Sequence, residues 1–226
     1  EQEQANLEIL IDKKEQELVN YQTDIKTKEE AIRQYEEEIE AVNRIAGEKG
    51  IEQNVLLRVT PGIDPHTHKK ISTGSVESKF GIAIETGQAK ETVEKLLKLE
   101  NIKLCGFHCH IGSQIFETEP FCDAAKIMIR FANDFRQKSG VTVDEIDLGG
   151  GFGVKYVESD GQIPFDNFLK AVSKELHSKA DELSIPLPKI YIEPGRSIVA
   201  PAAVSLYTVG AVKTIENIRT YVSIDG

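Results

Sequence analysis

The alternation of short apolar segments with helical segments between residues 55 and 193 limits the fold of this chain more than any other feature. Buried strands are predicted at 55–60, 104–108, 141–148 and 190–193, and amphipathic helices at 89–99, 119–138 and 165–183. Strands that alternate with helices of this length indicate βαβ units and a parallel sheet, which places the chain in the α/β class. This pattern fits an open doubly wound sheet and part of a barrel equally well.

A cluster of glycines follows the third predicted strand, in the sequence DLGGGFG at 147–153. Because glycine has no Cβ and adopts positive φ freely, such a turn can bring several backbone N–H groups close to one anion. A tight turn from strand to helix is the alternative explanation. The cluster is not a dinucleotide fingerprint, since Val154 stands where the last glycine is needed, and no Gly-Lys-Ser/Thr of a P-loop follows.

Polar residues also follow the other three strands. They lie at 64–68 after the first strand, at 108–114 after the second and at 193–197 after the fourth. Because the carboxyl ends of parallel strands face one crevice, we expect these loops to converge with the glycine cluster. Glycine amides together with the guanidinium group of Arg196 would suit a phosphate.

Histidines and cysteines give weaker signals. His108 and His110 lie two apart on an extended segment and would share a face, but no third ligand stands at a recognisable spacing, so no metal site is predicted. His66 and His68, in a polar loop, are expected to be solvated. Cys105, Cys109 and Cys122 lack CxxC spacing and are expected to be reduced thiols.

Three of these segments together resemble one enzyme family. HxHIGSQ at 108–114, DLGGGFG at 147–153 and EPGRS at 193–197 are similar in order and spacing to the motifs of diaminopimelate decarboxylases, which are fold-type III pyridoxal-phosphate enzymes. Ser78-Lys79-Phe80-Gly81 also fits, and the resemblance runs from about Glu38 to Gly226. The form His-Ile-Gly-Ser-Gln favours the diaminopimelate branch over the ornithine and arginine decarboxylases.

The resemblance implies a function and a set of site residues. The reaction would be the conversion of meso-diaminopimelate to L-lysine and CO2 in lysine biosynthesis, with pyridoxal 5'-phosphate as cofactor. His110 would stack on the pyridine ring, Glu193 would pair with its nitrogen, and Arg196 would contact the phosphate or a substrate carboxylate. The cofactor-binding residues implied are His110, Ser113, Gly149, Gly150, Gly151, Glu193, Pro194, Gly195 and Arg196.

The chain also departs from the family. The Schiff-base lysine of the family lies on the first barrel strand in a Tyr-Ala-x-Lys-Ala context, which this sequence lacks, and none of its cysteines stands at the position of the family's catalytic cysteine; no catalytic residue is therefore assigned. We expect a partial (β/α)8 TIM-type barrel, its second half, in 47–200, with 55–60 and 190–193 as edge strands. Strands at 203–214 and 220–224 would begin an antiparallel β-domain in 201–226 that is cut off.

Residues 1–46 contain no glycine or proline and are predicted to form one long helix. Ile11, Leu18, Ile25, Ile32, Ile39 and Ala46 recur at seven-residue spacing, but the partner positions hold Lys14, Tyr21, Lys28, Tyr35 and Val42. A weak coiled coil and a solvated helix with a narrow apolar stripe are both compatible with this pattern.

Charge and hydropathy limit the kinds of partner that this chain is expected to bind. Residues 1–49 carry 14 acids and 7 bases, and residues 50–226 carry 23 acids and 20 bases, so no basic face for nucleic acid is expected. Without a long apolar run or a signal peptide, the chain is expected to be cytoplasmic and unattached to membranes. The family implies an amino-acid substrate and a dimer built across the active sites.

Two other functions stay open. The chain could be a catalytically silent protein, binding pyridoxal phosphate or another phosphate compound, or acting through its heptad helix. It could also be another fold-type III amino-acid decarboxylase. The absence of the family's Schiff-base lysine distinguishes the catalytically silent protein from an active enzyme.

Overall fold

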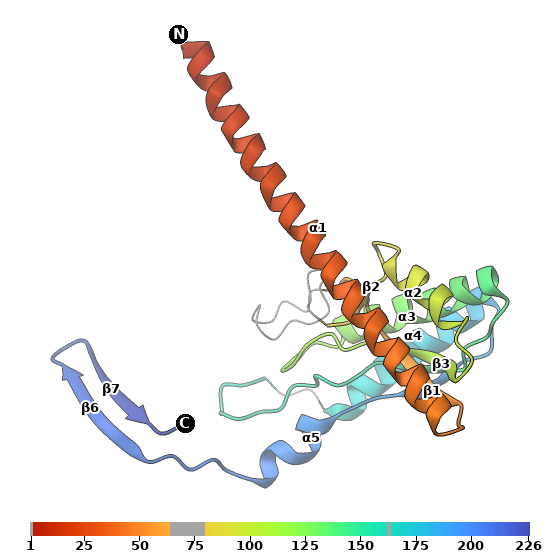
Figure 1. Cartoon of the computed structure of the whole chain (residues 1–226). Helices are drawn as coiled ribbons and strands as arrows, with labels where there is room; N and C mark the ends of the chain where they lie inside the picture. Colours follow the sequence, from red (N-terminus) through yellow and green to blue (C-terminus); the bar gives the residue numbers. More distant parts are fainter. Residues whose placement is uncertain (1, 64–79, 162–163) are drawn as a thin grey trace.

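The computed structural model describes residues 2–63, 80–161 and 164–226 (Figure 1). Its centre is a parallel sheet in the order β2-β1-β3-β4-β5, which confirms the predicted α/β architecture. The strands are β1 (Gln53–Thr60), β2 (Ile82–Ala83), β3 (Ile102–His108), β4 (Glu145–Asp147) and β5 (Lys189–Tyr191). The helices are α1 (Gln2–Glu48), α2 (Gln88–Leu96), α3 (Glu119–Ser139), α4 (Phe165–Leu183) and α5 (Gly195–Val199), followed by the 3-10 turn η1 (Ala200–Ala202).

The sheet differs from the predicted one in three respects. It has a fifth strand, β2, which is too short to give a periodic pattern, and β2 pairs with Val59 and Thr60. The prediction that 55–60 forms an edge strand was therefore wrong, whereas β5 is an edge. The strand predicted at 141–148 is confined to β4, because only Glu145–Asp147 pair with both β3 and β5.

The core lies between the sheet and helices α2, α3 and α4. Phe107 of β3 is fully buried and meets Phe131 of α3 edge-on, with ring centroids 4.7 Å apart. Phe121 of α3 stacks on Phe152 at 4.5 Å and meets Phe168 of α4 edge-on at 5.4 Å. These rings fix α3 and α4 against the loop that follows β4, so the core directly supports the glycine cluster.

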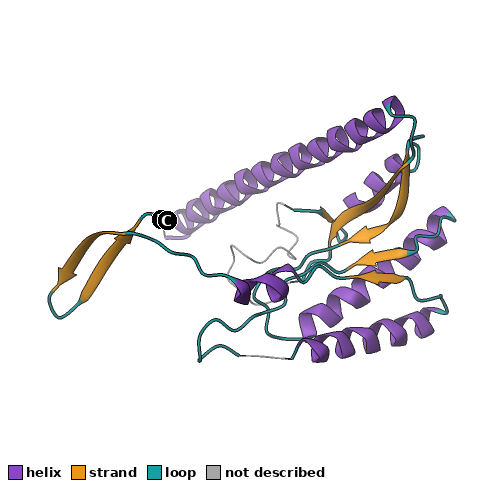
Figure 2. Cartoon of the chain, turned by 90° about the horizontal axis from the view of Figure 1, so that it is seen from below, coloured by secondary structure: helices purple, strands orange, loops and turns teal. Residues whose placement is uncertain are grey.

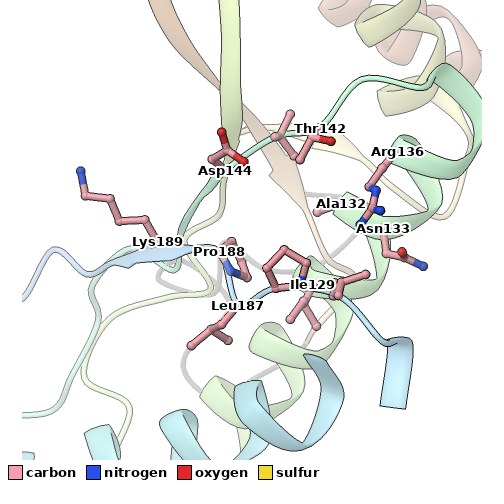
Figure 3. Close-up of a pocket in the computed structure, with 12 residues that line it drawn as sticks. Ile129, Ala132, Asn133, Arg136, Thr142, Asp144, Leu187, Pro188 and Lys189 are labelled. Atoms are coloured by element: carbon pink, nitrogen blue, oxygen red, sulfur yellow. The ribbon is translucent and has the colours of Figure 1, made fainter. Parts of the chain in front are cut away.

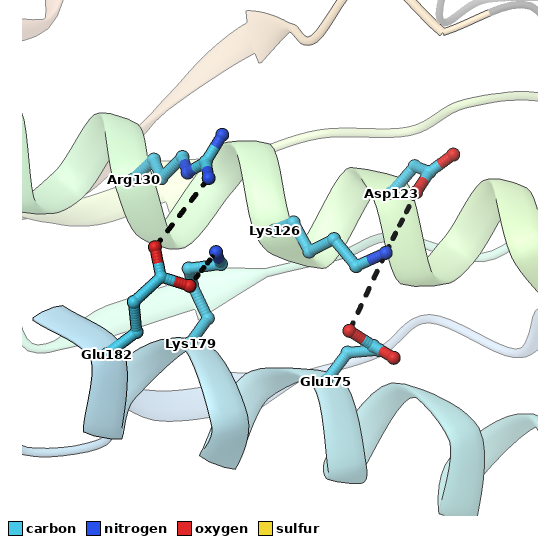
Figure 4. Close-up of polar contacts among 6 residues, drawn as sticks. All are labelled: Asp123, Lys126, Arg130, Glu175, Lys179 and Glu182. Atoms are coloured by element: carbon cyan, nitrogen blue, oxygen red, sulfur yellow. Dashed lines mark hydrogen bonds and ion pairs between the residues drawn. The ribbon is translucent and has the colours of Figure 1, made fainter.

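Ion pairs also join α3 to α4 (Figure 4). Lys126 lies 3.6 Å from Glu175, and Arg130 lies 3.8 Å from Glu182. All four side chains are at least one-third exposed, so each pair is worth about 0–1 kcal/mol. The buried rings therefore dominate the docking of these two helices.

Helix α1 projects away from the sheet at its amino-terminal end (Figure 1). Toward its other end Tyr35, Ile39 and Val42 pack against the core, and Ala46 is buried. The last part of the predicted heptad stripe thus contacts the chain's own body, whereas Leu18 is 57% exposed. Pairing of the projecting part with another helix stays a prediction. Within the described ranges, no helix combines the length and apolarity needed to cross a bilayer.

Strands β6 (Val209–Ile215) and β7 (Arg219–Ile224) form an antiparallel hairpin that lies apart from the sheet (Figure 2). Every residue of the hairpin is exposed. The strand predicted at 203–214 begins only at Val209, because 203–208 have no partner strand among the described residues. Helix α5, between Glu193 and this segment, was not predicted.

Candidate functional site

Polar side chains meet at the carboxyl ends of β3, β4 and β5. His108 ends β3, Asp147 ends β4, and Glu193 follows β5. The Nε2 atom of His108 lies 3.3 Å from Oε2 of Glu193, and ligand atoms of all three residues lie within 4.8 Å of one another. The predicted convergence of these loops is therefore observed. The loop 64–68, with His66 and His68, lies outside the described residues, as do Ser78 and Lys79.

The glycine cluster lies in close backbone contact with the loops that follow β3 and β5. A Cβ on Gly150 would lie 2.1 Å from the carbonyl oxygen of Glu193, and one on Gly151 would lie 2.2 Å from that of Gly112. Gly149 and Gly151 also have φ values of 69° and 102°, which favour glycine. Close backbone approach, rather than flexibility, thus explains the three consecutive glycines.

Two of the three glycine amides already have acceptors in the protein. The Gly149 N–H donates to Oδ1 of Asp147 at 2.8 Å, and the Gly150 N–H donates to Nδ1 of His110 at 3.1 Å. The Gly151 N–H makes no hydrogen bond within the described residues. Of the amides that were expected to face a phosphate, Gly151 is the one left for a ligand. Asp147 opens the motif, but sequence reasoning gave it no role.

His110 is held as a neutral imidazole. Burial lowers its pKa from the usual value, and the charges of Arg58 and His108 lower it further. Because Nδ1 accepts from Gly150, the ring proton of the neutral form lies on Nε2. His110 does not belong to the group formed by His108, Asp147 and Glu193. Asp147 already binds a backbone amide and His108 contacts Glu193, so we assign no metal to this group.

Gln114 connects the loop after β3 to the glycine cluster. Its Oε1 accepts from the Val154 N–H at 2.9 Å, and its Nε2 donates to the Val154 carbonyl at 3.1 Å. Next to it, Ile115 and Phe152 form a parallel bridge between the same two loops. Sequence reasoning missed this role, although Gln114 is the last residue of HxHIGSQ.

Arg196 lies in the first turn of α5, and its Nη1 donates to the hydroxyl of Tyr156 at 2.8 Å. Tyr156, in the loop beyond the glycines, was not among the predicted site residues. The turn between β5 and α5 is closed by the Gly195 N–H, which donates to the Glu193 carbonyl at 2.8 Å, with Pro194 between them. Ser113 is half-buried, and its hydroxyl has no hydrogen-bond partner in the parts of the chain that the structure describes.

Cys109 lies beneath the site without taking part in it. It is fully buried, and burial together with the charge of Asp147 raises the pKa of its thiol to about 12. The thiol is therefore protonated at neutral pH and acts as a packing residue. All three cysteines are free.

Comparison with known families identifies the type of domain. The model of the family described as "Pyridoxal-dependent decarboxylase, pyridoxal binding domain" matches residues 11–200. This chain belongs to that family. The resemblance predicted from the three motifs is confirmed, and the match begins within α1, earlier than the expected Glu38. The expected cofactor class agrees with the family's description.

Members of the pyridoxal-dependent decarboxylase family with known names share this region. The chain is 46% identical over 190 residues to diaminopimelate decarboxylase of Staphylococcus aureus, covering 84% of this chain and 44% of the relative. A diaminopimelate decarboxylase of M. jannaschii solved with L-lysine superposes with a TM-score of 0.67 at 33% identity, covering 88% of this chain and 47% of that one. The diaminopimelate decarboxylase of Helicobacter pylori solved with L-lysine superposes with a TM-score of 0.66 at 30% identity, covering 84% of this chain and 44% of that one. The chain thus spans less than half the length of these relatives.

Proposed function

We propose that this chain binds the phosphate and pyridine ring of pyridoxal 5'-phosphate, and that the whole protein decarboxylates meso-diaminopimelate to L-lysine. The observation that carries the proposal is the glycine cluster, which is pressed against both neighbouring loops and leaves the Gly151 amide for an anion. A division into a helix (1–46), a half-barrel (47–200) and a β-segment (201–226) is part of the same proposal.

The residues at the phosphate end fit the chemistry of the group. The Gly151 amide, the Ser113 hydroxyl and the Arg196 guanidinium are donors, as a phosphate dianion requires. The hydrogen bond from Arg196 to Tyr156 leaves the other guanidinium N–H groups available. Gly149 and Gly150, whose amides are occupied, shape the turn instead of binding the phosphate.

His110 and Glu193 would hold the ring. The neutral imidazole of His110 would lie on the ring face, in an orientation set by the Gly150 N–H. The Glu193 carboxylate would hold a proton on the ring nitrogen, because a negative charge beside a basic nitrogen favours its protonated form. Bound with that nitrogen protonated, the cofactor would supply an electron sink for loss of the substrate carboxylate.

The substrate assignment rests on the named relatives. Those with 36–46% identity are diaminopimelate decarboxylases, and two solved relatives hold L-lysine. Arg196 could alternatively bind the substrate carboxylate. A cytoplasmic location and a dimer that completes the sites are further parts of this proposal.

Equilibrium binding of pyridoxal phosphate and of pyridoxal to the 226-residue chain tests the phosphate site. We expect pyridoxal phosphate to bind more tightly, and Arg196→Ala to remove about 1.5–3 kcal/mol of that binding through loss of a charged hydrogen bond. Arg219→Ala, in the hairpin, is the matched control and should change nothing. Equal binding of the two compounds, unaffected by Arg196→Ala, would contradict the proposal.

Release of CO2 from meso-diaminopimelate tests the activity separately. The assay needs the whole protein, because residues 1–226 contain no Tyr-Ala-x-Lys-Ala segment. We expect no turnover by residues 1–226 alone. Cofactor binding without turnover by the whole protein would favour the catalytically silent alternative.

A further inference from the structure

A cavity of about 280 Å³ lies at the opposite end of the sheet, where β4 and β5 begin (Figure 3). Helix α3 forms one wall, and the segment that leads from α4 into β5 forms the other. The apolar lining consists of Ile129, Ala132, Val143, Ile185, Pro186, Leu187 and Pro188. The volume is slightly below the range of about 300–1,000 Å³ that is usual for small-molecule sites, so a ligand would be small.

Asn133 is the unusual residue in this cavity. It is only 5% exposed, yet its side-chain amide makes no hydrogen bond within residues 2–63, 80–161 and 164–226. Buried amides almost always have partners, and an unpaired one costs about 1–3 kcal/mol. A buried, unsatisfied amide that lines a cavity indicates a polar partner supplied by a ligand.

Two opposite charges flank the same cavity. Arg136 lies three residues after Asn133 on α3, so the two side chains project to the same side of the helix. Asp144 lies on the other side of the cavity in Figure 3. Neither Arg136 nor Asp144 forms an ion pair within the described part of the chain. Lys189 also lines the cavity, but its Nζ lies over the Tyr191 ring at 4.6 Å from the centroid and points away.

We propose that this cavity binds an α-amino acid with an apolar side chain. Arg136 and Asn133 would bind the carboxylate, the first by charge and the second through its free N–H groups. Ile129, Leu187 and the two prolines would contact the apolar body. Asp144 would bind the ammonium group. The site lies at the end of the sheet opposite to the glycine cluster, and the proposal does not depend on cofactor binding.

Titration of the full chain, labelled at its Ile, Leu and Val methyl groups, with L-leucine tests the site by NMR. We expect saturable shifts of the Ile129, Ile185 and Leu187 methyl signals with a dissociation constant of about 1 mM or lower. Arg136→Gln should weaken binding about tenfold or more. Arg130→Gln removes the same charge from an exposed position of α3 outside the cavity and should leave binding unchanged.

4-Methylpentanoate separates an amino-acid site from a general carboxylate site. It has the carboxylate and apolar body of leucine without the ammonium group, so it should bind more weakly, and Asp144→Asn should weaken the binding of leucine to the level of 4-methylpentanoate. Both Asp144 and Arg136 are exposed, so these variants should fold. Absence of saturable shifts, equal effects of Arg136→Gln and Arg130→Gln, or equal binding of leucine and 4-methylpentanoate would overturn the proposal.

Discussion

At the scale of single residues, Gly150 shows how little room the glycine cluster leaves. An added Cβ would meet the backbone carbonyl of Glu193, which cannot rotate away as a side chain could. We predict that Gly150→Ala lowers the free energy of unfolding by about 1–3 kcal/mol, measured by urea denaturation. Gly161→Ala is the control, because a Cβ there has no neighbour within 4 Å. A Gly150→Ala variant as stable as the Gly161→Ala variant would show that the loop is not packed as described.

His110 gives a prediction about pH. Burial lowers its pKa below the ordinary value of 6.5, so the unfolded chain takes up a proton before the folded chain does. The stability contributed by neutral His110 is fully present above about pH 6.5 and is lost as the pH falls through 6.5 toward the folded-state pKa.

Two measurements check this prediction. An NMR titration of the His110 imidazole should give a midpoint below 6.5. The difference in unfolding free energy between the wild type and His110→Gln should shrink as the pH falls from 7 to 5. Gln137→Ala, a change at an exposed residue of α3 that does not titrate, should show no such trend. A His110 midpoint at or above 6.5 would contradict the structure.

At the scale of elements, the site depends on connections between loops that belong to different strands. Gln114 binds both backbone groups of Val154, a residue 40 positions away in the sequence. The same two loops are joined by the Ile115–Phe152 bridge, and Phe152 in turn packs on Phe121 of α3. The glycine cluster is thus held by its neighbours on two sides and by the core beneath it.

We predict that Gln114→Ala costs about 1–3 kcal/mol, since it leaves the N–H and the carbonyl of Val154 without partners. The effect should be local, so hydrogen exchange of the Val154 amide should become at least about tenfold faster while that of Ile146 in β4 stays slow. Gln137→Ala, at an exposed position of α3, serves as the control. Unchanged exchange at Val154 would mean that the two hydrogen bonds do not hold the loop.

At the scale of the whole molecule, two surfaces are unusual for a monomer. Among the described residues, strand β5 is an open edge of the sheet, with unpaired backbone groups on one side. The β6–β7 hairpin exposes Val212 and Val222, a cross-strand pair, by 61% and 52%. An isolated two-stranded hairpin is marginally stable in water, so this element needs further contacts to persist.

We predict that the 226-residue chain self-associates at micromolar concentration, as measured by sedimentation velocity. Replacing both Val212 and Val222 by lysine should reduce association if the hairpin forms the contact, whereas Val199→Lys, at an exposed position outside it, should not. A monodisperse monomer with cooperative unfolding would refute this prediction.

The sequence by itself was sufficient to predict the features that depend on local residue patterns. The apolar periodicity of 165–183 predicted α4 with both ends correct, because a helix is built from contacts three and four residues apart. The motifs identified the family and the convergence of the last three loops, since the carboxyl ends of parallel strands lie together in every such sheet.

Only the tertiary structure decided which groups pair. The sequence could not show that Asp147 and His110 occupy the Gly149 and Gly150 amides, that Gln114 reaches Val154, or that Tyr156 holds Arg196. It also gave no sign of the cavity around Asn133. These contacts join residues whose positions are set by the packing of whole elements. The spacing of residues along the chain does not show whether a given amide has a hydrogen-bond partner.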